Sequence, residues 1–359
     1  MEKSKYFVNP DIRKAETLPA EAFTSKEFLD LEIEKIFMRS WLWAPCCTPK
    51  ENEWAPFEIL GRKFFLMCDE SGTIRAFPNA CTHKWRQLAE EKGTGSKIIC
   101  RYHGRQFGLD GSFIAQARCV GLEDFPRQCD SLQSVPFRKV YDFAFVGIGQ
   151  TQPHLDGVFS PVNNHLFDLP LDEMTLVVAY HASIDGNWKY HLDNYVDELH
   201  LKFVHGGKGG LASETDIDTY QTKLFSHSTV RLVYAKNNDD GFMLAGFPRP
   251  LFGVWWHIFP NLTVNIWKGG ISINAYEPDL GNPHKTNLVV RHYAWNKKDF
   301  DATRSKWAKM RVDDEDLNVV AGVQKVIRHT PVPRGRFTPD VEAACHWFQQ
   351  KIYEMIFEK

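Results

Sequence analysis

Two short motifs each pair a cysteine with a histidine. The first is Cys81-x-His83, and after sixteen further residues the second is Cys100-x-x-His103. Each motif offers one thiolate and one imidazole on a tight loop, and the residues between them can return as a hairpin. Zinc fingers group like ligands together, as C-x2-4-C and H-x3-5-H. The mixed pairs instead favour a two-iron cluster with sulfur ligands at one iron and nitrogen ligands at the other, with zinc as the alternative metal.

A second group of potential ligands lies further along the chain. Asp193, Asp197, His200 and His205 form the pattern D-x3-D-x2-H-x4-H. On a helix, Asp197 and His200 share a face, so the carboxylate can orient the imidazole. The two histidines are five residues apart, about 140° round a regular helix. Both can bind one metal only at a distorted or terminating turn, for which Gly206-Gly207 is suited.

An acidic stretch towards the C-terminus supplies a third candidate ligand. Asp316 is the last of four consecutive acidic residues that begin at Asp313. Such a run is usually a solvated helix face, and this remains the alternative interpretation. Two histidines and one carboxylate on one face of Fe(II), however, leave positions open for O2 and a substrate. We therefore include Asp316 with His200 and His205 as a candidate iron site.

The elements before and around the first motif predict a helix followed by an all-β unit. Residues 17–40 suit a helix that Thr24 or Ser25 caps. The apolar side chains expected on one face of this helix are Phe28, Leu29, Ile33 and Ile36. From Trp41 to about residue 150 the pattern changes to short apolar runs broken by turn signals, and Leu-Asp-Gly-Ser at 109–112 predicts a hairpin.

The rest of the chain mixes strands and helices. Residues 151–164 are rich in proline, glycine and polar side chains, which predicts a linker. Strand-like runs begin near residues 175, 228, 263, 271 and 287. Helices are expected over residues 191–205, over 300–328 and after Pro339.

The composition narrows the class of function. The 359 residues predict two or three domains, and 43 basic against 45 acidic side chains argue against a nucleic-acid partner. Eight cysteines are too few for a disulfide scaffold but sufficient for a metal site. The N-terminus lacks the apolar run of a secretory signal, and the longest uncharged apolar stretch, at 251–267, is interrupted by polar residues and proline. We expect a cytoplasmic protein with no membrane partner.

The first pair of motifs resembles the Rieske [2Fe-2S] motif. Flanking residues agree with it, namely Asn79, Tyr102-His103-Gly104 and Leu109-Asp110-Gly111. The chain departs from the commonest form at Lys84-Trp85, where Arg-Gly is frequent, and at Arg105, where Trp is frequent. These positions are not ligands, so the departures concern the subfamily.

The second group resembles the iron site of the Rieske-type ring-hydroxylating oxygenases. That family carries Asn-Trp-Lys just upstream, here residues 187–189, and an acidic third ligand in a pattern E-D-x4-E-x2-Q. Glu315-Asp316 is followed at the right distances by Ala321 and Gln324, so Asp316 matches the ligand and Ala321 departs from the usual Glu. The resemblance covers nearly the full length of the chain.

The resemblance implies an α+β fold in three segments. These are an N-terminal helical segment at 1–40 that packs on the catalytic domain, an all-β Rieske [2Fe-2S] domain at 41–150, and a mononuclear-iron catalytic domain at 151–359. In the catalytic domain, helices cover an antiparallel sheet.

The resemblance also assigns two cofactors. It implies a Rieske-type [2Fe-2S] cluster and a mononuclear Fe(II), bound respectively by Cys81, His83, Cys100 and His103 and by His200, His205 and Asp316. The cluster relays electrons to the iron, which activates O2 to hydroxylate or oxidatively demethylate a small organic substrate. Family members form a head-to-tail homotrimer, in which Asp197 matches the acid that bridges an iron-ligand histidine to the Rieske histidine of the next subunit, here His103 or His83.

The source of electrons follows from a feature that the sequence lacks. No G-x-G-x-x-G fingerprint follows a strand, and the glycines at 206–210 do not fit it. Electrons from NAD(P)H therefore arrive from a separate reductase, directly or through a ferredoxin.

Several alternatives remain open at this point. Within the enzyme class, a quaternary ammonium substrate is favoured over cis-dihydroxylation of an aromatic compound. A Rieske electron-transfer protein without oxygenase activity is an alternative of another class, and a structural zinc protein is a third. Aromatic side chains that can form either a cation–π wall for a substrate or part of the core are Trp255, Trp256, Phe259 and Trp267.

Overall fold

The computed structural model of the chain describes residues 2–141, 143–149, 169–170 and 173–358. The linker expected at 151–164 lies outside these residues. The chain divides into two compact units, one formed by Trp41–Thr151 and the other by Met1–Ser40 together with Gln152–Lys359. None of the helices in the described part of the chain is both long and apolar enough to cross a membrane.

The smaller unit is built from short antiparallel strands, as its broken apolar runs predict. One sheet has the order β1-β10-β9, a second β4-β3-β2-β5, and a third β6-β7-β8. Their bounds are β1 Trp41–Ala44, β2 Glu53–Ile59, β3 Arg62–Cys68, β4 Ile74–Pro78, β5 Gly93–Thr94, β6 Lys97–Ile99, β7 Gln106–Gly108, β8 Phe113–Ala115, β9 Phe137–Val140 and β10 Phe143–Gly147.

The hairpin expected at 109–112 joins β7 to β8. Asp110 accepts hydrogen bonds from the backbone N–H and the hydroxyl of Ser112, and Gly111 takes a φ of 87°. That left-handed conformation is one that glycine adopts without strain. The turn closes over a core in which Phe65, Phe77 and Phe107 surround the two motif cysteines.

The larger unit contains one seven-stranded antiparallel sheet with the order β11-β17-β16-β15-β14-β13-β12. Strands β12 to β17 pair with their neighbours in sequence, while β11 joins the far edge by pairing with β17. The bounds are β11 Thr175–Asp185, β12 Gln221–Leu224, β13 Ser228–Tyr234, β14 Leu251–Ile258, β15 Leu262–Trp267, β16 Gly270–Pro278 and β17 Lys285–Ala294.

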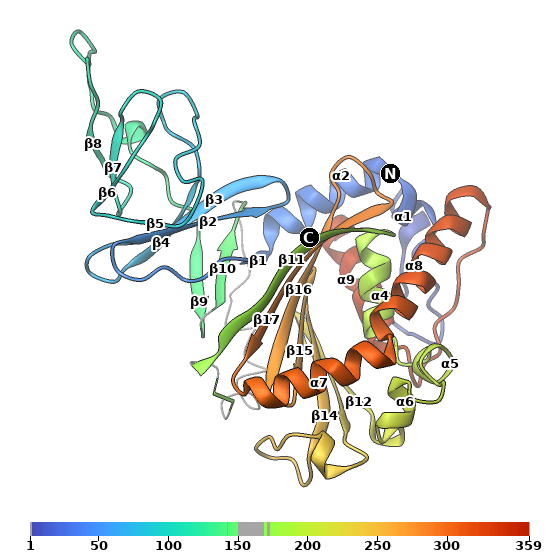
Figure 1. Cartoon of the computed structure of the whole chain (residues 1–359). Coiled ribbons are helices and arrows are strands. Elements are labelled where there is room, and N and C mark those ends of the chain that lie inside the picture. Colours follow the sequence, from blue (N-terminus) through green and yellow to red (C-terminus); the bar gives the residue numbers. More distant parts are fainter. Residues whose placement is uncertain (1, 142, 150–168, 171–172, 359) are drawn as a thin grey trace. The chain divides into compact units, whose positions relative to one another are not determined.

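Helices lie over one face of this sheet (Figure 1). Contacts join α4 and α7 to β16, α8 to β11 and α9 to β12. The bounds are α1 Glu21–Thr24, α2 Lys26–Lys35, α4 Trp188–Val196, α5 Leu201–Val204, α6 Leu211–Glu214, α7 Lys297–Met310, α8 Val312–His329 and α9 Ala343–Phe357.

The N-terminal helix α2 is fastened to α4 by a buried ion pair. Ser25 caps α2 by accepting a hydrogen bond from the backbone of Phe28, as expected. Glu32 Oε1 lies 2.6 Å from Lys189 Nζ, and both side chains are fully buried. Burial raises the pKa of Glu32 and lowers that of Lys189, and each partner's charge opposes the other's shift. Trp188 adds a 2.9 Å hydrogen bond to Glu32, so the start of α4 is held firmly.

Two expected helices differ from the structure. The helix expected at 300–328 is two helices, α7 and α8, because Arg311 takes a left-handed φ of 56° between them. The helix expected at 191–205 ends at Val196, and only Leu201–Val204 resume it. Both breaks redirect the chain next to the candidate iron ligands, where tertiary contacts override helix propensity.

Candidate functional site

The structure brings His200, His205 and Asp316 together. Their potential ligand atoms all lie within 4.8 Å of one another. Oδ1 of Asp316 is 3.1 Å from Nε2 of His205 and 3.5 Å from Nε2 of His200. The centroids of the two imidazole rings are 5.1 Å apart. Both rings present their Nε2 atoms to Oδ1 of Asp316.

Helix α4 ends before the two histidines. Asp197 follows the helix with extended backbone, at φ −73° and ψ 134°. Its carboxylate accepts hydrogen bonds from the backbone N–H of Leu199 and His200 and so caps the next turn. His200 and His205 then flank the four-residue helix α5. This single helical turn ends at His205, whose φ of −104° and ψ of 16° are no longer helical, so the terminating turn expected before Gly206-Gly207 is present.

Asp197 orients the imidazole of His200. Its Oδ2 atom lies 3.0 Å from Nδ1 of that ring. The contact is the expected one, but the two residues do not share a helix face, because Asp197 lies in the bend after α4. With its Nδ1–H held by Asp197, the neutral ring leaves the lone pair of Nε2 free for a metal.

Glu315 holds the second imidazole in the same way, and sequence reasoning missed it. Its Oε2 atom lies 2.6 Å from Nδ1 of His205. Glu315 and Asp316 are neighbours on α8, so their side chains diverge by about 100° and contact opposite nitrogens of one ring. The signal in the sequence is the Glu-Asp doublet itself, which suits a solvated helix face equally well.

The charges at this site suit a divalent cation. Although burial works against it, Asp197 and Asp316 raise the pKa of His200 to about 9. Burial raises the pKa of Asp316, but interactions with His200 and His205 lower it well below its usual range. Oδ1 of Asp316 is buried and has no hydrogen-bond partner among the described residues. Two imidazoles and one carboxylate aimed at a common point match the donor set of non-heme Fe(II).

The four motif residues of the smaller unit lie on two matching loops. The backbone N–H of Cys81 donates to Arg86 O and that of Cys100 to Arg105 O, each at 2.8 Å. Four residues after each cysteine, the N–H of Trp85 or Gly104 returns to the cysteine carbonyl at 2.9 Å. The two loops therefore share one hydrogen-bonding pattern.

This pattern shows why glycine suits the position of Trp85. Trp85 and Gly104 occupy equivalent positions and take similar left-handed φ angles of 56° and 71°. Glycine adopts this conformation without strain, but a bulky side chain adopts it rarely. The indole itself is 82% exposed, so it places no bulk inside the loop.

The donors on these loops fit a cluster with two kinds of ligand. Cys81 and Cys100 are each 1% exposed, whereas His83 and His103 are half-buried. The two imidazole rings lie 4.6 Å apart, and Nδ1 of His83 is buried with no hydrogen-bond partner among the described residues. Paired thiols on the inside and paired imidazoles nearer the surface match a Rieske-type [2Fe-2S] centre.

Asp193, a candidate residue to which the sequence assigned no role, lies on α4, one turn before Asp197. Gln349 of α9 donates a 3.1 Å hydrogen bond to its carboxylate. Burial raises the pKa of Asp193 to about 7. Its neighbour Asn194 helps to lower the pKa of Asp316, so this turn of α4 lies against the candidate iron site.

The four aromatic residues in and between β14 and β15 do not form one wall. Trp255 and Trp267 share the helix-covered face of the sheet, and each lies 6.3 Å from the ring of Trp307 on α7. Trp256 points to the other face because side chains alternate along a strand. Phe259 packs on Phe348 of α9. Trp267 belongs to one buried cluster with Ala294 and Phe300, and Trp255 and Trp307 pack against another that contains Phe252, so these side chains are part of the core.

Two family models match the chain. The model described as the ring hydroxylating alpha subunit (catalytic domain) matches residues 171–358, and the Rieske [2Fe-2S] domain model matches residues 43–126. These ranges contain the second and first groups of candidate ligands, respectively.

Similar proteins are found among both sequences and solved structures. A chloroplastic choline monooxygenase of Atriplex hortensis is 27% identical over 95% of this chain and 78% of the relative. The oxygenase subunit of a carnitine monooxygenase from Acinetobacter baumannii is 23% identical over 90% of this chain and 88% of the relative. The structure of a quaternary ammonium Rieske monooxygenase matches with a TM-score of 0.81 at 21% identity, over 97% of this chain and 96% of the other.

Proposed function

The chain belongs to the ring-hydroxylating alpha-subunit family of Rieske non-heme iron oxygenases, and from this premise we propose that it hydroxylates or oxidatively demethylates a small quaternary ammonium compound. Family membership makes it an oxidoreductase and the terminal oxygenase component. Its cofactors are a Rieske [2Fe-2S] cluster and a mononuclear iron. The α+β fold, an all-β Rieske domain followed by a catalytic domain of helices on an antiparallel sheet, agrees with the expectation.

We assign the iron to His200, His205 and Asp316. The observation that carries this assignment is the convergence of two imidazole Nε2 atoms on one oxygen of Asp316, at 3.1 and 3.5 Å. We assign the cluster to the two cysteines and two histidines of the matching loops, Cys81, Cys100, His83 and His103. In the domain division that we propose, residues 1–40 form a helical segment packed on the catalytic domain, 41–150 the Rieske domain and 151–359 the catalytic domain.

The residues around the iron site prepare it for binding. When bound, the iron supplies O2 activation and the cluster supplies single electrons. Asp197 and Glu315 each hold the Nδ1 side of one imidazole and thereby fix which nitrogen faces the metal. Three protein ligands leave further coordination positions for O2 and substrate.

Electron supply requires partners. Enzymes of this family generally need a reductase and electron transfer between subunits. We propose an NAD(P)H-dependent reductase, acting directly or through a ferredoxin, and a head-to-tail homotrimer. In the trimer, Asp197 bridges His200 to His103 or His83 of the neighbouring subunit. Asp197 is suited to this role because one carboxylate oxygen already contacts His200.

The substrate class is supported by the relatives. The similar proteins are named as choline and carnitine monooxygenases. The competing outcome is cis-dihydroxylation of an aromatic compound at the same iron site.

Oxygen uptake with a compatible reductase tests the proposal. The substrate panel comprises choline, carnitine, short betaines and aromatic acids, with product analysis for hydroxylated, demethylated and dihydroxylated species. Uptake coupled to a betaine or choline product supports the proposal, whereas a cis-diol from an aromatic acid contradicts it. Iron and acid-labile sulfide analysis separates an oxygenase from a zinc protein, and a cluster without any coupled uptake points to an electron carrier.

A further inference from the structure

Arg105 is the buried cation beside the cysteine and histidine loops. Its side chain is 4% exposed, and among the described residues of the smaller unit it is the only lysine or arginine that is buried. It directly follows Gly104 at the end of the second loop. Its guanidinium lies over the rings of Phe113 and Phe125, at 5.3 and 5.7 Å. Water therefore screens this positive charge poorly.

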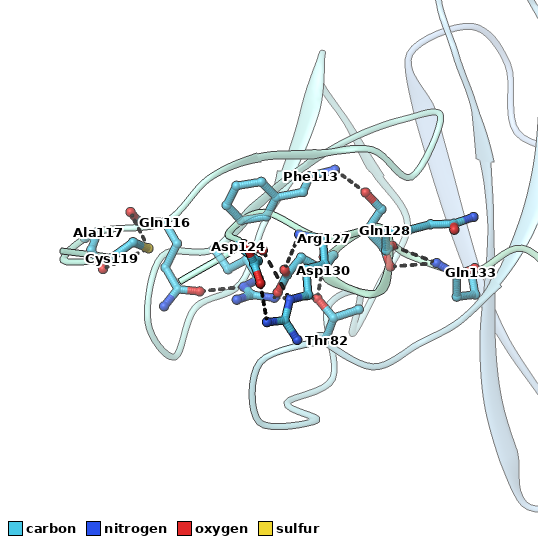
Figure 2. A network of polar contacts seen from close by, with 12 residues as sticks. Thr82, Phe113, Gln116, Ala117, Cys119, Asp124, Arg127, Gln128, Asp130 and Gln133 are labelled. Atoms are coloured by element: carbon cyan, nitrogen blue, oxygen red, sulfur yellow. Dashed lines mark hydrogen bonds and ion pairs between the residues drawn. The ribbon is translucent and has the colours of Figure 1, made fainter. Parts of the chain in front are cut away.

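The guanidinium has a defined set of polar partners. Nε donates to Gln116 at 2.5 Å, and Nη1 donates to Thr82 at 2.8 Å. Nη1 also lies 3.1 Å from Oδ1 of Asp130, which is mostly buried as well. Figure 2 shows these three partners, Thr82, Gln116 and Asp130, within one polar network.

These contacts connect both ligand loops. Thr82 lies between Cys81 and His83, and its hydroxyl also donates to the carbonyl of Asp130 at 2.7 Å. The carbonyl of Arg105 accepts the backbone N–H of Cys100. The residue therefore touches the first loop through its side chain and the second through its backbone. Any cluster bound by these loops lies within the field of this charge.

We propose that Arg105 is a positioning residue that raises the reduction potential of the [2Fe-2S] cluster. The inference rests on the proposed function, since it concerns the cluster assigned to these loops. Reduction adds one electron from the external reductase to the cluster, with no bond made or broken. A buried positive charge stabilises the more negative, reduced form, while the carboxylate of Asp130 partly offsets that effect.

The two charges make opposite predictions. Arg105→Met keeps an unbranched, though shorter, side chain and removes the positive charge, so the midpoint potential should fall. Asp130→Asn removes the negative charge but keeps an oxygen that can accept from Arg105, so the midpoint potential should rise. Arg105→Lys retains the charge and should stay closer to the wild type than Arg105→Met does. If Arg105 had only a structural role, the two substitutions would not shift the midpoint potential in opposite directions.

Redox titration of the purified oxygenase, followed by circular dichroism and electron paramagnetic resonance, measures these potentials. Arg75→Met is the matched control, because Arg75 of β4 belongs to the same unit but pairs, at 2.6 Å, with Asp69, the residue after β3. Its potential should equal that of the wild type.

The outcomes are separable. Opposite shifts in Arg105→Met and Asp130→Asn, with Arg75→Met unchanged, support the proposal. Equal potentials in all variants, or shifts of the same sign, overturn it. If Arg105→Met loads no cluster, Asp130→Asn alone decides, since a potential that does not rise overturns the proposal. A wild-type protein with iron but no acid-labile sulfide overturns the proposed function itself, whereas unchanged potentials in a loaded cluster overturn only the role of Arg105.

Discussion

Glu315 contacts Nδ1 of His205 at 2.6 Å, from the position next to Asp316 in the chain. The carboxylate thereby fixes the tautomer in which Nε2 faces Asp316. Loss of a carboxylate that holds a metal-binding histidine typically lowers metal affinity by about 10–100-fold. We expect Glu315→Gln to weaken iron binding to this extent without altering the spectrum of the cluster.

Iron titration of the metal-free protein checks this expectation. Asp314→Asn is the matched control, because Asp314 precedes Glu315 on α8 and is exposed, with Arg311 as its ion-pair partner. An unchanged affinity in Glu315→Gln would show that His205 needs no such support.

Asp316→Ala removes the carboxylate of the candidate iron site. We expect this variant to lose the mononuclear iron and substrate-coupled oxygen uptake, because two histidines alone hold the metal weakly. The visible spectrum of the [2Fe-2S] cluster should persist, since its ligands belong to the other unit. Iron-to-sulfide ratios and oxygen uptake give the measurement, and retained turnover would rule out Asp316 as a ligand.

Asp197→Asn keeps a side chain of the same shape but removes its charge. The cluster should still load, while iron affinity should fall by about 10–100-fold, as for Glu315→Gln. At saturating iron, steady-state oxygen uptake should still fall, because the bridging carboxylate is lost. Reduction of the cluster by the reductase should remain fast, because Asp197 acts in the later transfer of electrons from the cluster to the iron. Stopped-flow measurement of cluster reduction and reoxidation separates the two steps, and normal reoxidation would contradict the bridging role.

Asp193 predicts a specific dependence of stability on pH. Burial raises its pKa from the ordinary 3.8 to about 7. Between these two values the folded protein binds more protons than the unfolded chain, so this group lowers the free energy of unfolding as pH rises from about 4 to about 7. The loss is about 1.4 kcal/mol for each pH unit that separates the folded and unfolded pKa values.

Asp193→Asn removes this titration and keeps an oxygen for Gln349. Melting temperatures of wild type and variant across that pH range provide the measurement. The wild type should lose stability relative to the variant as pH rises, and parallel curves would contradict the burial of a titrating Asp193.

Lys189→Met breaks the buried ion pair with Glu32. Removal of one partner from such a pair destabilises a protein by about 3–5 kcal/mol, because the remaining charge is buried alone. The double variant Lys189→Met with Glu32→Leu should recover much of the loss. Lys26→Met is the control, since Lys26 pairs with Asp30 on the exposed surface of α2, the helix that carries Glu32. An exposed pair of this kind contributes at most about 1 kcal/mol to stability. Chemical denaturation measures the free energy of unfolding of the single variant, the double variant and the control, and so distinguishes the three.

The sequence predicted the parts of the site that depend on local spacing. The mixed C-x-H and C-x-x-H motifs indicated two loops with both ligand types, and the cap at Ser25 and the turn at 109–112 were also correct. Spacing alone also indicated that His200 and His205 need a distorted turn.

The remaining features depend on contacts between distant segments. Glu32 sits on a helix whose polar residues usually face water, and only its packing on Lys189 buries it. Glu315 meets His205 across 110 residues of chain. The break at Arg311 lacks a proline or glycine, so the sequence favours a regular helix over 300–328.

The pairing of β11 with β17 has a consequence for the order of assembly. The first strand of the large sheet finds its partner only when the last strand exists, and Asp316 follows that last strand in sequence. During synthesis, more than a hundred further residues must therefore be added before β11 and the turn that carries His200 and His205 meet their partners. Long-range pairing of this kind slows folding and leaves strand edges open to aggregation. Iron can meet its full set of ligands only after Asp316 has been synthesised, so metal loading follows the synthesis of all seven strands of the large sheet.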